Sequence, residues 1–208
     1  MAESLKGRIA IIGWGSLIWD LDDLAPKVEG AWLMGAGPRL PMEFSRVSPK
    51  RKQALAVCLD ATHGAPCQTN AILSVRGRID EAAEDLRARE RAKHITFIGA
   101  HFGGETVQAA TPAVADAIAN WCLVTGAAGA VWTDLDPNYQ SVCGEPFSVD
   151  RGMAYLRSLS GESLIEAVRY IEYAPSATDT PLRRALAAEE WWRALAEEYA
   201  GSEQSVLR

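Results

Sequence analysis

Hydrophobic residues in the first two thirds of the chain come in short runs that end at glycine, proline or polar residues. Short apolar runs rich in β-branched residues, bounded in this way, are typical of buried strands. They predict strands over residues 8–13, 31–34, 42–47, 55–59, 71–75, 95–102, 106–109 and 129–133. The segment 60–69 is expected to be a loop between two of these strands.

Two helices are predicted among these strands. Asp80 is expected to cap a helix that runs to about Lys93, because acidic residues follow it in the first turns, where they favour the helix dipole. Thr111-Pro112 has the pattern of a cap followed by proline at the first helical position, and this second helix is expected to stop near Gly126.

Beyond Pro137 the pattern becomes helical, with amphipathic segments over 148–159, 162–173 and 180–201. No long linker precedes this tail, so it is expected to pack onto the sheet-rich part. The sequence therefore predicts one α+β domain over 1–208, with a core at about 8–135 and a helical C-terminal extension at about 146–200.

Composition narrows the function classes. The chain has 208 residues and a net charge of −6, and its basic residues 50–52 form only a short cluster, which argues against a nucleic-acid partner. The start of the chain lacks the pattern of a signal peptide, and no apolar run approaches the ~18 residues of a membrane span. We therefore expect a cytoplasmic protein with no membrane partner.

The cysteines and histidines do not indicate a metal site. Cys58, Cys67, Cys122 and Cys143 are far apart and form no CxxC pair, and the three histidines show no ligand-like spacing beside them. Reduced thiols and the absence of a bound metal are expected.

A glycine-rich loop follows the first predicted strand, and it reads Gly13-Trp14-Gly15-Ser16-Leu17. Glycines allow a sharp turn and bring backbone N–H groups close to a ligand, where they can hold a carboxylate or a developing oxyanion. The third glycine of a dinucleotide fingerprint and the Gly-Lys-Ser/Thr of a phosphate loop are both missing. The structural alternative is a tight turn whose tryptophans, Trp14 and Trp19, pack in the core.

Glu90 stands four residues after Leu86, on or beside the apolar face of the predicted helix. A carboxylate drawn partly out of water can take up and return protons near neutral pH. The alternative is a solvent-facing last turn in which Glu90 pairs with Arg87 or His94.

Taken together, these motifs resemble the γ-glutamyl cyclotransferase superfamily, and its ChaC-type branch in particular. The loop resembles the family's glycine-tyrosine-glycine-serine-leucine-isoleucine-tryptophan loop, with Trp14 in place of tyrosine. Phe44-Ser45, Ser48 and Arg51 resemble the pattern that follows, and Leu86-x-x-Arg89-Glu90 matches the helix that carries the catalytic glutamate. The resemblance spans roughly residues 8–110, and the tail resembles an extension found in bacterial relatives.

The resemblance implies a mixed, partly closed β-barrel or sheet with packed helices. It implies that Glu90 is the general acid/base of a reaction that converts an L-γ-glutamyl amide or amine into 5-oxoproline and a free amine, without a cofactor. Gly13, Trp14, Gly15, Ser16 and Leu17 would bind the substrate, and Arg51 would read a second carboxylate or else lie on the surface beside Lys50 and Lys52.

Other functions remain open from the sequence. A catalytically silent small-molecule-binding or regulatory module would keep the pocket without the chemistry, and a γ-glutamyl amine transferase would pass the glutamyl group to an acceptor. Glutathione, γ-glutamyl amino acids and γ-glutamyl amines are all candidate substrates. Trp191 and Trp192 are interpreted as core or subunit-contact residues, which leaves a homodimer open.

Overall fold

The first strand of the chain lies in the middle of a six-stranded mixed sheet. This strand, β1 (Ile9–Gly13), pairs antiparallel with β6 (Asn70–Ser74) and parallel with β9 (Gly129–Thr133). The sheet has the order β2-β6-β1-β9-β7-β8; its other strands are β2 (Val28–Leu33), β7 (Ile98–Phe102) and β8 (Glu105–Gln108). Because β2 and β8 are edges that do not pair with each other, the sheet is not a closed barrel.

The computed structural model describes the backbone of residues 2–206 and the side chains of residues 4–200. The chain divides into two compact units. The first unit consists of Met1–Pro41 with Pro66–Leu135, and the second of Met42–Ala65 with Asp136–Arg208. That the two units fold together as one domain, as expected from the sequence, stays a prediction.

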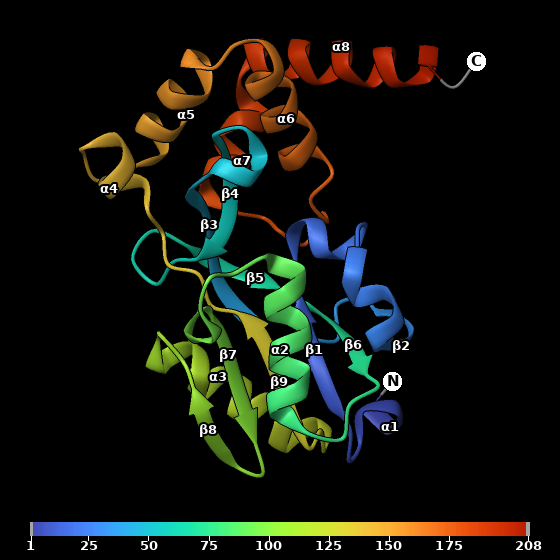
Figure 1. The fold of residues 1–208 in the computed structure, drawn as a ribbon. Coiled ribbons are helices and arrows are strands. Elements are labelled where there is room, and N and C mark those ends of the chain that lie inside the picture. The colour runs from blue at the N-terminus through green and yellow to red at the C-terminus, as the bar shows by residue number, and fades with distance from the viewer. Residues whose placement is uncertain (1, 207–208) are drawn as a thin grey trace. The chain divides into compact units, whose positions relative to one another are not determined.

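In the first unit, helix α2 (Ile79–Glu90) lies across the six-stranded sheet (Figure 1). Its buried Ala82, Ala83 and Leu86 form one hydrophobic cluster with apolar side chains of the sheet. The remaining elements of this unit are α1 (Ala2–Leu5), α3 (Pro112–Thr125) and the 3-10 turns η1 (Gly15–Ile18), η2 (Asp22–Lys27) and η4 (Ile95–Phe97).

The second unit combines an antiparallel pair of strands with the C-terminal helices. Strand β3 (Arg39–Ser48) pairs with β4 (Ala54–Leu59) in a three-stranded sheet of order β4-β3-β5, and the turn η3 (Pro49–Arg51) joins them. Along β3 and β5 (Ala65–Gln68) the chain passes from one unit to the other. The helices are α4 (Tyr139–Cys143), α5 (Val149–Ser158), α6 (Gly161–Glu172), α7 (Pro181–Ala188) and α8 (Glu190–Val206).

The coarse α+β prediction is confirmed, and several boundaries are corrected. The segment 60–69, expected to be a loop, contains β5, and the strand expected from residue 95 begins with η4. The single helix predicted over 180–201 is two helices, because Glu189 adopts an extended conformation between α7 and α8. Asp80 lies inside the first turn of α2, and Arg78 is the cap residue.

None of the helices in the described part of the chain is long and apolar enough to cross a membrane.

Candidate functional site

The loop after β1 needs glycine at two positions for two different reasons. A Cβ atom on Gly13 would lie 2.3 Å from the indole ring of Trp32, so the close approach of that ring excludes a side chain. Gly15 has a φ of 53°, in the left-handed region that favours glycine. The turn predicted from the sequence is therefore present at Gly15, whereas glycine at position 13 answers to the close approach of Trp32.

Leu17 of the turn η1 is buried in the same hydrophobic cluster as Leu86 of α2. The carbonyl of Ser16 accepts from the amides of Trp19 (3.3 Å) and Asp20 (3.0 Å) and so closes the turn. No side chain caps the start of η1, and the first N–H groups of such a turn have no acceptor inside it. Trp14 precedes them in an extended conformation and is itself buried.

Helix α2 ends at Glu90 rather than near Lys93. Arg91 adopts a left-handed conformation with a φ of 53°, and its amide bonds back to the carbonyl of Ala88. The amide of Ala92 bonds to the carbonyl of Arg87 (3.1 Å), which completes a common helix-terminating arrangement. Glu90 is thus the last helical residue.

Arg89 is the buried residue at this helix end, with a side chain only 1% exposed. Its Nε donates to the carbonyl oxygen of Asp20 at 3.1 Å, and its Nη2 donates to the same oxygen. Nη1 has no hydrogen-bond partner among the described residues, but it lies 3.8 Å from Oε1 of Glu90. Sequence analysis included Arg89 in the Leu86-x-x-Arg89-Glu90 motif but assigned it no role. Its position three residues after Leu86, in line with the apolar face of the helix, was the signal available for its burial.

Glu90 is partly buried, with 19% of its side chain exposed. The ion pair with Arg87 that the alternative interpretation expected is absent from the described interactions, since Arg87 binds Glu84 (2.6 Å) and the carbonyl of Ala92 (2.7 Å). His94 makes a ring contact with Phe97 instead. Glu90 therefore faces Arg89, at the helix end that is tied to the segment following the glycine-rich loop.

Two buried polar residues, which sequence analysis did not identify as candidates, lie at the end of the sheet where β1 finishes. Asn70, directly opposite Gly13, donates to the carbonyl of Gly13 at 3.4 Å and accepts from the amide of Gly35 at 2.8 Å. Asp134 follows β9 and accepts from the amide of Ala110. No sequence pattern distinguished them, because their position depends on the pairing of distant strands.

The candidate residues do not all lie in one unit. Gly13, Trp14, Gly15, Ser16, Leu17 and Glu90 belong to the first unit, whereas Arg51 belongs to the second. The Arg51 side chain binds Glu166 at 2.7 Å and lies 4.5 Å from the centre of the Tyr170 ring. The guanidinium of Arg51 therefore contacts side chains of α6. It does not lie free on the surface, as one of the two interpretations expected.

No group of three or more metal-ligating side chains is found within the part of the chain that the structure describes. Comparisons of the whole chain with family models, with curated proteins and with solved structures find no match.

Proposed function

We propose that the chain is a γ-glutamyl cyclotransferase-like enzyme, which cleaves an L-γ-glutamyl amide or amine into 5-oxoproline and a free amine. The observation that supports this most directly is the partly buried carboxyl group of Glu90 beside Arg89, whose guanidinium is bonded to Asp20 just past the glycine-rich loop. The proposed chemistry needs such a carboxyl group, together with backbone N–H groups like those that begin η1.

The reaction is an intramolecular acyl transfer. The α-amino nitrogen of the substrate attacks its own γ-carbonyl carbon, a C–N bond closes the five-membered ring, and the bond from that carbon to the leaving nitrogen breaks. Because nucleophile and carbonyl belong to one molecule, folding the substrate into the reactive geometry provides much of the rate acceleration.

Glu90 serves both proton transfers in this proposal. Its carboxylate accepts a proton from the α-ammonium, which frees the nucleophile, and the resulting acid donates that proton to the leaving nitrogen. The second proton that the attacking nitrogen loses on ring closure passes to the released amine, which leaves as an ammonium ion. General acid–base help of this kind contributes typically about 10²- to 10⁴-fold in rate. The amides of Gly15, Ser16 and Leu17 would hold the α-carboxylate or the oxyanion.

The test is 5-oxoproline formation from glutathione, γ-glutamyl amino acids and γ-glutamyl amines, followed by mass spectrometry. Glu90→Gln is expected to lower the rate at least about 100-fold with the fold intact. Glu81→Gln, an exposed glutamate on the same helix, is the matched control and should keep full activity. An active Glu90→Gln variant would remove Glu90 from the mechanism.

The same measurement separates the rival functions. A transferred γ-glutamyl adduct would indicate an amine transferase, and a ligand bound but unchanged would indicate a binding module. The burial of Trp14, 8% exposed where the family has a tyrosine, is the observation that favours the binding module.

A further inference from the structure

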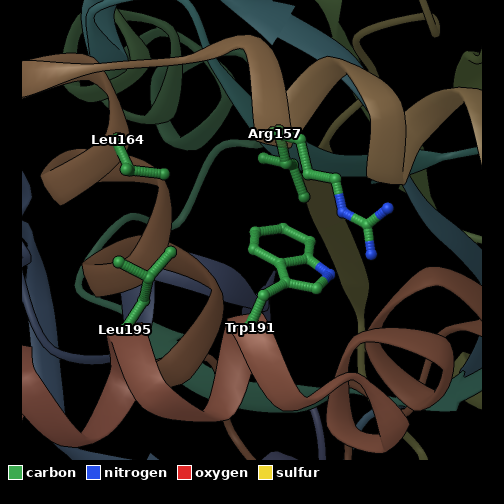
Figure 2. A pocket seen from close by; sticks show the side chains of 5 residues that line it. Arg157, Leu164, Trp191 and Leu195 are labelled. Atoms are coloured by element: carbon green, nitrogen blue, oxygen red, sulfur yellow. The ribbon is translucent and has the colours of Figure 1, made fainter.

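Two adjoining cavities lie between the helices of the second unit. The first has a volume of about 250 Å³ and is lined by Leu156, Arg157, Leu164, Trp191 and Leu195 (Figure 2). The second has a volume of about 380 Å³; it shares Leu164 and Leu195 with the first and adds Gly161, Ile165, Val168, Glu198 and Tyr199. Because they share two side chains, we treat them as one α6–α8 trough.

The floor of this trough is apolar. Leu164 on α6 and Leu195 on α8 face each other in Figure 2. Ile165, in the wall of the trough, is 55% exposed, so a large apolar side chain is open to solvent there. A concave apolar surface with few polar groups is typical of small-molecule sites.

At one end of the trough lies Arg157, whose positive charge is balanced by an ion pair. The Arg157 guanidinium lies 4.8 Å from the centre of the Trp191 ring, and it forms an ion pair with Glu189 at 2.6 Å. Glu189 also accepts from the Trp191 indole N–H at 3.0 Å. An anionic ligand at this end would compete with Glu189 for Arg157, so the end favours an uncharged group.

The other end carries a free negative charge. Glu198 is exposed, and it has no ion pair among the residues that the structure describes. The ring of Tyr199 lines the same cavity, and an aromatic face attracts cations. Seven residues of helix separate Trp191 from Glu198, which corresponds to about 10 Å along α8.

We propose that the α6–α8 trough binds an amphiphilic cation, a primary amine with a medium-length aliphatic tail. The ammonium group lies at Glu198 and Tyr199, and the tail lies between Leu164 and Leu195 toward Trp191. This binding site is separate from the γ-glutamyl chemistry proposed above and does not depend on it.

Isothermal titration calorimetry of the full chain with n-octylammonium tests the proposal. We expect one ligand per chain, and at least ten-fold weaker binding of n-octanoate, which has the same tail and the opposite charge. n-Butylammonium should also bind at least ten-fold more weakly, because each buried methylene contributes roughly three- to four-fold. Equal binding of the octyl cation and anion would overturn the proposal.

Variants locate the site. Glu198→Gln should weaken n-octylammonium binding about two- to five-fold, the scale of an exposed ion pair, whereas Glu197→Gln on the neighbouring exposed position should not. Ile165→Lys, at an exposed position, should weaken n-octylammonium binding at least ten-fold by removing an apolar wall and adding a like charge.

Two outcomes would contradict this assignment even if n-octylammonium binds. Unchanged affinity in both Glu198→Gln and Ile165→Lys would place the ligand elsewhere. If instead Ile165→Lys converts a dimer into a monomer in sedimentation, the trough is covered by a second copy of the chain, and the amine proposal fails.

Discussion

Arg89 donates two hydrogen bonds to the carbonyl oxygen of Asp20 and thereby ties the end of α2 to the segment that follows the glycine-rich loop. The arginine side chain is almost fully buried, whereas Asp20 lies at the surface. Since Glu90 is the next residue, the position of its carboxyl group relative to the loop depends on this anchor.

Arg89→Met is expected to lower the free energy of unfolding by about 1.5–3 kcal/mol, the scale of hydrogen bonds made by charged groups. Arg91→Met is the matched control, because Arg91 is 67% exposed and pairs with Asp22 at 3.3 Å, a pair expected to contribute less than about 1 kcal/mol. Urea denaturation measures both. Equal losses in the two variants would show that Arg89 is no anchor.

Gly13→Ala is expected to destabilise the fold by about 1–3 kcal/mol, because the new methyl group would overlap the Trp32 ring. In a Trp32→Ala background the same substitution should cost less than half as much. A double-mutant cycle measured by urea denaturation reports the difference. Full additivity of the two changes would mean that the contact with Trp32 is not the reason for glycine.

Burial raises the pKa of Glu43 above its ordinary value of 4.5, although bonds from Thr180 and from the amides of Phe44 and Leu182 oppose the shift. The folded chain therefore holds this proton more tightly than the unfolded chain. Stability linked to Glu43 is fully present below pH 4.5 and is lost as the pH rises through the folded-state pKa. Glu43→Gln should remove this decline.

The measurement is the unfolding free energy of both proteins between pH 4 and pH 7. The wild-type value should fall relative to that of Glu43→Gln as the pH rises, whatever constant offset the substitution adds. Parallel curves would show that Glu43 has the same pKa in the folded and unfolded chains.

Asp60 should behave in the opposite way. Burial alone would raise its pKa, but bonds from the Ser45 hydroxyl and from the amides of His63 and Thr62 outweigh burial and hold the pKa below 3.8. Its stabilising contribution is present above pH 3.8 and is lost as the pH falls through the folded-state pKa. Asp60→Asn should cost about 1–3 kcal/mol at pH 7 and progressively less in acid; a pH-independent loss would contradict this assignment.

Much of the fold could be predicted from local pattern. Apolar runs located the strands of the six-stranded sheet, and Thr111-Pro112 and Gly126 marked the ends of α3 correctly. The break at Glu189 could not be predicted, because no glycine or proline marks it. The end of α2 was missed for the same reason, since Arg91 is a non-glycine residue in a left-handed conformation.

The site was predictable only as far as its residues follow from local spacing. Gly13, Gly15 and Glu90 stand out in the sequence, because turn chemistry and helical periodicity act over a few residues. Asn70, Trp32 and the bond from Arg89 to Asp20 depend on strand pairing and packing between distant segments. The same limit applies to Arg51, whose partner Glu166 comes from a helix 115 positions later.

The central claim is that the substrate's own α-amino group displaces the amine with the help of Glu90. The most direct measurement compares two versions of one γ-glutamyl compound, with the α-amino group free or acetylated, incubated with the wild type and with Glu90→Gln. The account predicts 5-oxoproline and free amine from the unblocked compound with the wild type, a rate at least about 100-fold lower with Glu90→Gln, and neither product from the acetylated compound with either protein. Release of amine from the acetylated compound, or 5-oxoproline made by Glu90→Gln at the wild-type rate, would contradict it.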